Sequence, residues 1–143
     1  MVHSGERRVL VVHDDPVFTA GLTRALGVAV DVAVDGRAAI ASIARSRPAI
    51  VCVSLNLPRD SGYDLCEQIR KDRGLDHVQI LVISDRHSPE IIAYAEEAGA
   101  NAFLAQPFTL ALLARHVRAM LAVDHQARAA AIPRHLDEGL ALE

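Results

Sequence analysis

The sequence predicts an α/β fold in which a doubly wound, parallel, five-stranded sheet lies between helices on both faces, giving three layers (α/β/α). Two observations carry this prediction. Short runs rich in Val, Ile and Leu alternate five times with segments whose apolar residues recur at helical spacing. These runs are continuous and do not alternate with polar residues, which indicates strands buried on both faces of a parallel sheet.

Each strand is predicted from a run of β-branched and other apolar residues that ends at a polar or turn-forming position. The second run, for example, is followed by Asp35-Gly36, a dipeptide typical of turns. The predicted strands are RVLVVH (8–13), AVDVAV (29–34), AIVCVS (49–54), QILVIS (79–84) and AFLA (102–105).

The helix predictions rest on apolar stripes and on residues that cap helix ends. Asp15 is predicted to be the N-cap of the first helix, because the Pro16 that follows it is favoured at the first helical position. Ser88 and Pro89 repeat this pattern for the fourth helix, and Gly99 is placed to end it. The predicted helices are residues 16–26, 37–46, 63–72, 88–99 and 109–122.

The length of 143 residues and the hydrophobic content of 51% fit one domain with its own core. The net charge of −3 and the absence of a long basic run argue against direct nucleic-acid binding. No run approaches the ~20 apolar residues of a membrane span, and the N-terminus does not resemble a signal peptide, so we expect a cytoplasmic protein. We divide the chain into a flexible N-terminus (1–6), a domain (7–122) and a helical extension or linker (123–143).

Functional sites of doubly wound sheets lie at the carboxyl ends of the strands, so the residues that end or follow each run are the candidate site residues. The residues expected at this edge are His13, Asp14, Asp15, Ser54, Ser84, Asp85 and Gln106. The two cysteines, Cys52 and Cys66, fall on apolar faces and are expected to be buried thiols.

Several motifs, in their order and spacing, resemble the receiver domain of bacterial two-component response regulators. The resemblance covers roughly residues 7–122 and rests on VLVVHDDP, VAVDGRAAI, NLPRDSG, AGANAFLAQPF and LLARHVRAML. It implies a flavodoxin-like (βα)5 fold and a role in phosphorelay signal transduction. A receiver typically accepts a phosphoryl group on an Asp at the end of the third strand, next to Mg²⁺ held by two acids after the first strand.

By this resemblance Ser54 stands at the acceptor position, and His13 and Asp14 stand at the two acid positions. Ser84 corresponds to the hydroxyl residue that ends the fourth strand, and Gln106 to the lysine that precedes a proline after the fifth. Two further roles are implied: the carbonyl of Asn56 would face the metal, and the switch aromatic would be Phe103.

These substitutions remove the family's chemistry. A serine hydroxyl without a neighbouring base is a poor nucleophile, whereas a carboxylate attacks a phosphoryl donor to give a labile acyl phosphate. Mg²⁺ prefers hard oxygen ligands, of which only Asp14 remains as a residual candidate, so we expect weak or absent Mg²⁺ binding and no cofactor. No acid occurs between Gly36 and Arg59, so no neighbour can replace the missing acceptor carboxylate. The single lysine, Lys71, lies on the third helix and cannot replace the missing lysine at the carboxyl edge.

The sequence therefore predicts a pseudo-receiver: a non-enzymatic, phosphorylation-independent module that acts in signal transduction through protein–protein interaction. One alternative is a small-ligand sensor that uses the vacated acidic pocket. Another is a switch modified on Ser54 by a separate kinase. A hydrolytic triad of Ser54, His13 and Asp14 is disfavoured, because no oxyanion hole is evident and the family order explains all three residues.

The predicted interaction surface is the face formed by the fourth helix, fifth strand and fifth helix, which receivers commonly use for partners and dimers. The fourth helix carries acidic residues and the fifth carries basic ones, so a two-fold axis would bring opposite charges together in a homodimer. The alternative is two ordinary solvated helix faces. The residues assigned to this surface are Tyr94, Glu96, Glu97, Arg115 and Arg118.

Overall fold

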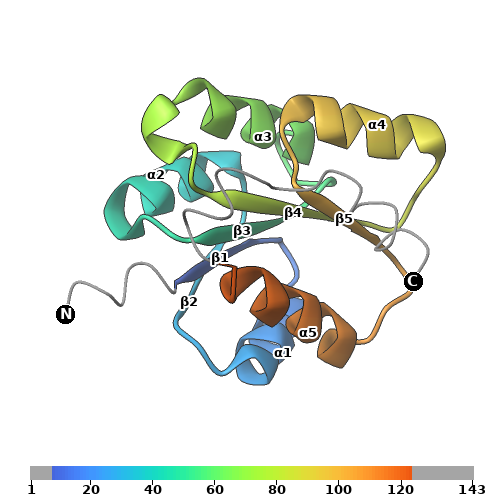
Figure 1. The fold of residues 1–143 in the computed structure, drawn as a ribbon. Helices are drawn as coiled ribbons and strands as arrows, with labels where there is room; N and C mark the ends of the chain where they lie inside the picture. Colours follow the sequence, from blue (N-terminus) through green and yellow to red (C-terminus); the bar gives the residue numbers. More distant parts are fainter. Residues whose placement is uncertain (1–7, 124–143) are drawn as a thin grey trace.

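Five parallel strands form one sheet in the order β2-β1-β3-β4-β5, as the sequence predicts for a doubly wound fold (Figure 1). The computed structural model describes residues 8–123, so the expectations for residues 1–6 and for the extension after Val123 lie outside the described part. The strands are β1 (Val9–Val12), β2 (Val30–Ala33), β3 (Ile50–Ser54), β4 (Gln79–Ser84) and β5 (Ala102–Ala105).

Helices cover both faces of the sheet: α1 and α5 lie on one face, and α2, α3 and α4 lie on the other (Figure 1). In the described part, no helix is long and apolar enough to cross a membrane. The helices are α1 (Pro16–Leu26), α2 (Gly36–Ser46), α3 (Gly62–Lys71), the short 3-10 turn η2 (Arg73–Leu75), α4 (Pro89–Ala98) and α5 (Leu110–Leu121).

The predicted helix caps are confirmed. The Asp15 carboxylate accepts a hydrogen bond from the backbone N–H of Val17 at 3.0 Å, which satisfies one of the N–H groups left free at the start of α1. The Ser88 hydroxyl does the same for Ile91 at 3.2 Å in α4. Gly99 ends α4 with φ of 114°, a left-handed conformation that favours glycine.

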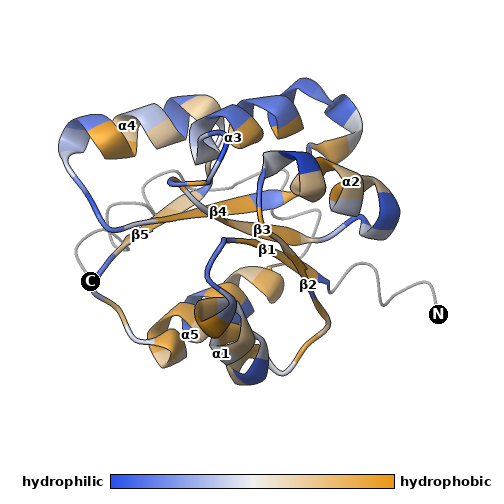
Figure 2. Cartoon of the chain, turned by 180° about the vertical axis from the view of Figure 1, so that it is seen from behind, coloured by the Kyte–Doolittle hydropathy of each residue, from blue (hydrophilic) through white to orange (hydrophobic). Residues whose placement is uncertain are grey.

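The core consists of two apolar layers, one on each side of the sheet (Figure 2). Aromatic residues make up only 3% of the chain, so both layers are built chiefly from Ala, Val, Leu and Ile. Cys52 and Cys66 lie in different layers, and burial raises the pKa of each thiol to about 12. The prediction of two buried thiols is therefore confirmed.

One sequence-based expectation fails at the edge of the sheet. β2 was predicted to be buried on both faces, yet Val32 is 48% exposed and Val34, just after the strand, is 53% exposed. β2 pairs only with β1 and forms an edge of the sheet. An apolar run does not reveal which strand is at the edge, because the strand order is set by the path of the whole chain.

The register brings the carboxyl ends of the inner strands together. Val12 of β1 pairs with Val53 of β3, Ser54 pairs with Ile83 of β4, and Ser84 pairs with Ala105 of β5. The backbone continues this pairing beyond the last strand, since the N–H of Gln106 donates to the Ser84 carbonyl at 2.8 Å. Residues that follow four different strands are thus placed at one edge of the sheet.

A buried amide fixes the far end of α5. The Gln79 side chain is 4% exposed, and its Nε2 donates to the backbone carbonyl of Met120 at 2.8 Å. The last carbonyls of a helix have no partner within the helix, so this hydrogen bond satisfies one of them and ties α5 to the start of β4.

Replacing Gln79 with Met is expected to destabilise the fold by about 0.5–1.5 kcal/mol, because the buried hydrogen bond from the side-chain amide to the Met120 carbonyl is lost. Urea unfolding measures this difference. The control is Gln68→Met on the exposed face of α3, which we expect to change stability by less than about 0.5 kcal/mol. Equal effects of the two substitutions would contradict this role for Gln79.

Candidate functional site

A cavity of about 230 Å³ opens at the carboxyl edge of the sheet. Residues that follow β1, β3, β4 and β5 line it, as the register requires. All six residues that the sequence assigns to the degenerate phosphorylation pocket are among them. The lining residues are His13, Asp14, Asp15, Phe18, Ser54, Asn56, Ile83, Ser84, Asp85 and Gln106.

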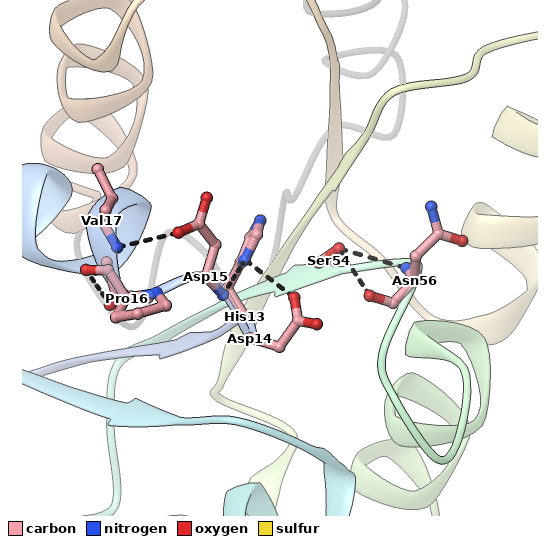
Figure 3. Close-up of polar contacts among 8 residues, drawn as sticks. His13, Asp14, Asp15, Pro16, Val17, Ser54 and Asn56 are labelled. Carbon is pink, nitrogen blue, oxygen red and sulfur yellow. Dashed lines mark hydrogen bonds and ion pairs between the residues drawn. The ribbon is translucent and has the colours of Figure 1, made fainter.

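His13 is held as a neutral imidazole. Its Nδ1 accepts a hydrogen bond from the backbone N–H of Asp15 at 3.1 Å, so the proton of the neutral ring lies on Nε2 (Figure 3). Burial lowers the pKa of His13 below its ordinary value, although the carboxylates of Asp14 and Asp15 act in the opposite direction. The Asp14 carboxylate lies 3.6 Å from Nδ1, and with a lone pair at that nitrogen the contact is not an ion pair.

Two phenylalanines that the sequence did not assign to the site extend the imidazole into an aromatic column. The His13 ring stacks on Phe18 with centroids 4.3 Å apart and planes at 15°. Phe18 in turn meets Phe108 edge-on at 6.5 Å. Phe18 belongs to the apolar stripe of α1, which predicts only burial, and the sequence carries no signal that its ring would also support a strand-end histidine.

Ser54 ends β3 with its hydroxyl turned into its own loop (Figure 3). The side chain is 8% exposed. Its Oγ donates to the backbone carbonyl of Asn56 and accepts from the backbone N–H of the same residue, both at 3.3 Å. The carbonyl that the resemblance directs toward a metal is therefore engaged by the serine.

The loop after Ser54 is pressed against the strand by a glycine. A Cβ on Gly62 would lie 2.5 Å from the Ser54 carbonyl oxygen and 2.9 Å from Cα of Leu55, so only glycine fits without movement of the backbone. The Gly62 N–H donates to the Leu55 carbonyl at 3.0 Å. Asn56 and Ser61 form an isolated antiparallel β-bridge across the loop. The start of α3 is thereby fixed directly on the end of β3.

Two further polar side chains of the cavity, Ser84 and Asp85, also have hydrogen-bond partners. The Ser84 hydroxyl accepts from the N–H of Arg86 at 3.0 Å. Asn56 Nδ2 donates to the Asp85 carboxylate at 3.4 Å, so the exposed Asp85 is directed to the amide and not to His13. Gln106 is exposed and is joined to Pro107 by a cis peptide bond.

The donor set does not fit a firmly bound divalent cation. Asp15 is committed to capping α1, the imidazole takes the position of a second acid, and the Asn56 carbonyl accepts from Ser54. Within residues 8–123 no group of three or more His, Cys, Asp or Glu side chains is arranged to hold a metal. Mg²⁺ requires near-octahedral oxygen ligands, and Asp14 alone does not supply them.

The remaining assigned residues lie away from this cavity. Phe103 is fully buried on the side of the sheet covered by α2, α3 and α4. Tyr94 lies on the α3 flank of α4, where its ring stacks on Tyr63. Arg118 lies on the α1 flank of α5, and its guanidinium donates to the Ala25 carbonyl at 2.9 Å.

The α4-β5-α5 interaction surface stays a prediction, and the structure adds intramolecular contacts for two of its five residues. Tyr94 faces α3, and Arg118 caps α1. Glu96 and Glu97 lie on α4, and Arg115 lies with Arg118 on α5. Helical spacing identifies neighbours along one helix, whereas the packing of whole helices decides which flank a side chain occupies.

Comparison with known proteins agrees with the fold. Residues 9–118 match the family described as response regulator receiver domain, and the chain belongs to this family. Receiver domains act in two-component signal transduction. The protein is therefore of the two-component signalling class.

The sequence is similar to those of curated response regulators named MprA. The chain is 38% identical over 117 residues to the response regulator MprA of Mycolicibacterium vanbaalenii and 35% identical to MprA of Mycobacterium leprae. Each match covers 80% of this chain and 50% of the relative, so the chain spans about half the length of these curated relatives.

Solved structures show the same fold. A two-component response regulator of the LuxR family from Aurantimonas superposes with a TM-score of 0.73 at 26% identity, covering 82% of this chain and 86% of that one. The chemotaxis response regulator CheY4 of Vibrio cholerae superposes with a TM-score of 0.75 at 24% identity, covering 80% and 98%. These matches confirm the predicted flavodoxin-like order of strands and helices.

The lowered pKa of His13 predicts a specific pH dependence. The folded state resists protonation of this ring, so the unfolded state binds more protons below pH about 6.5, and stability falls as the pH drops from there through the folded pKa. A His13→Gln variant should lose less stability over that window, as urea unfolding at several pH values would measure. A ring that titrates at or above its ordinary pKa by NMR would contradict this explanation.

Added Mg²⁺ is expected to leave the melting temperature unchanged at millimolar concentration, because a cation that does not bind the folded state cannot stabilise it. Thermal unfolding with and without the metal tests this. Asp14→Asn is the matched control, since any small shift shared by both proteins is unspecific. A rise of several degrees that Asp14→Asn abolishes would show that the site holds metal after all.

Proposed function

We propose that this receiver domain works without phosphorylation and transmits its signal by binding other proteins. One observation carries the proposal: β3 ends in Ser54, a residue that is 8% exposed and whose hydroxyl is bonded to the backbone of Asn56. A group in that state offers neither a carboxylate for an acyl phosphate nor a free hydroxyl for an ester.

The surroundings of Ser54 support the same proposal. Transfer of a phosphoryl group builds negative charge that a cation must stabilise, yet within residues 8–123 no Lys or Arg lines the cavity. Gln106 offers only an uncharged amide at the position of the family's lysine. The carboxylates that remain, on Asp14, Asp15 and Asp85, would repel an incoming phosphate. The domain is accordingly proposed to be no enzyme.

A small-ligand sensor is the second candidate, and the cavity itself favours it. A volume of about 230 Å³ with carboxylates, hydroxyls and a neutral imidazole fits a small polar molecule that is neutral or cationic. A thermal-shift screen of such compounds separates the two candidates, because a ligand that binds only the folded state raises the melting temperature.

Modification of Ser54 by a separate kinase is less well supported. A kinase must reach the hydroxyl in an extended segment, whereas this one is buried at the end of an inner strand and bonded within its loop. Such modification would require the β3–α3 connection to open first.

Incubation with acetyl phosphate is expected to give no hydroxylamine-labile phosphoryl adduct on this chain, because no carboxylate stands at the end of β3. Intact-protein mass spectrometry before and after hydroxylamine treatment measures this. An adduct that hydroxylamine removes would overturn the proposal.

Reversion variants show which groups matter. The triple variant His13→Asp, Ser54→Asp, Gln106→Lys restores the acid, acceptor and lysine types together, and we expect it to gain measurable labelling. The single variants should stay inactive, since groups that act as a unit do not contribute additively. Labelling of Ser54→Asp alone would show that His13 and Gln106 are not limiting.

A further inference from the structure

The only two tyrosines of the chain lie together on the α3–α4 surface. Tyr63 of α3 and Tyr94 of α4 stack with centroids 4.9 Å apart and planes at 26°. Tyr94 is 58% exposed, which makes it the most exposed aromatic residue in the described part of the chain. A chain with 3% aromatic residues thus places two of its five on one patch of surface.

The pair continues the core toward the surface. Tyr63 packs against the apolar layer under α3 and α4, together with the half-buried side chains of Leu57 and Ile91. Burial raises the pKa of the Tyr63 phenol above its usual range, and the neighbouring Tyr94 adds to this. Tyr63 is therefore held in place from below, while the ring of Tyr94 presents area to solvent.

Acidic residues surround the pair. Glu67 lies one helical turn after Tyr63, and Glu90 and Glu97 lie one turn before and after Tyr94, all three exposed. One basic residue, Arg86, acts on Tyr63 from the β4–α4 loop. Arg70, further along α3, is turned to the backbone, where it donates to the Gly99 carbonyl at 3.0 Å.

We propose that the Tyr63–Tyr94 pair, with its rim of Glu67, Glu90 and Glu97, is a docking surface for an arginine-rich segment of another protein. Guanidinium groups stack on aromatic faces and pair with carboxylates, so one side chain type satisfies both features of the surface. Tyrosines that are anchored and partly exposed are also the residues that dominate binding energy at interfaces.

The negative charge of the rim favours an arginine-rich segment over two other possible occupants, a second copy of this chain and a nucleic acid. A second copy docked on the same face through a two-fold axis would bring the two glutamate rims together, which repels. A nucleic acid would place phosphates against the same carboxylates. A basic segment of a different protein is the occupant that complements the rim.

The tyrosine surface and the cavity are connected through the backbone at the start of α3. Tyr63 directly follows Gly62, whose backbone rests on the Ser54 carbonyl oxygen. The proposal deepens the proposed function, since it names the chemistry of a protein partner, but it does not depend on whether Ser54 can be phosphorylated.

The tyrosines provide their own probe. The chain contains no tryptophan and no other tyrosine, so its intrinsic ultraviolet fluorescence reports on this pair alone. We expect an oligoarginine peptide to change the fluorescence in a saturable, salt-sensitive manner. An oligolysine peptide of equal length should bind more weakly, because an ammonium group does not stack on a ring as a guanidinium does.

Variants separate the contribution of ring stacking to oligoarginine binding from that of charge. The affinity of each variant is measured by the fluorescence anisotropy of dye-labelled oligoarginine. Tyr94→Leu keeps an apolar side chain and removes the ring, and should weaken binding by about two- to fivefold, whereas Tyr94→Phe should not. Glu97→Arg should weaken binding by about two- to fivefold as well. The matched control is Asp76→Arg, an equal change of charge at an exposed position after η2.

Three outcomes would overturn the proposal: equal affinity for arginine and lysine peptides, no effect of Tyr94→Leu, or equal effects of Glu97→Arg and Asp76→Arg. A tyrosine-dependent dimer in sedimentation would also overturn it, by making a second copy the occupant. None of these results bears on the acetyl phosphate experiment, so failure here is distinguishable from failure of the proposed function.

Discussion

Parallel pairing of strands whose side chains are buried on both faces is the constraint on which the rest of this structure depends. Strands that pair in parallel all point the same way, so β1, β3, β4 and the edge strand β5 end at one edge of the sheet. Helices must then cover both faces, and with few aromatics the two core layers are filled by aliphatic side chains. Any polar residue that follows an inner strand is thereby delivered to a single cavity.

What that cavity can do follows from how its polar groups are satisfied. A cluster of acids at this edge would repel one another and would gain from a cation. Here an imidazole and a hydroxyl replace two of the positions, and each finds a partner in the adjacent backbone. The His13 imidazole and the Ser54 hydroxyl are thus engaged by hydrogen bonds within their own loops.

The segment from Ser54 to Tyr63 links the two surfaces that our proposals concern. It begins inside the cavity, crosses the end of β3 under the close contact made by Gly62, and emerges as the anchored half of the tyrosine pair. A partner bound on α3 and α4 would therefore press on the same backbone that holds the Ser54 hydroxyl.

The sequence by itself determined the fold class, the five strand and helix positions to within one or two residues, the caps at Asp15 and Ser88, and the strand-end residues that line the cavity, to which the family resemblance added Asn56. These are set by local periodicity, by capping chemistry and by the rule that parallel strands end together. Only the tertiary structure decided that Phe18 supports His13, that β2 is a partly exposed edge, that Arg118 caps α1, and that Tyr94 meets Tyr63. Each of those facts depends on which helix packs beside which, and that relation joins residues distant in sequence and leaves no periodic signal in the chain.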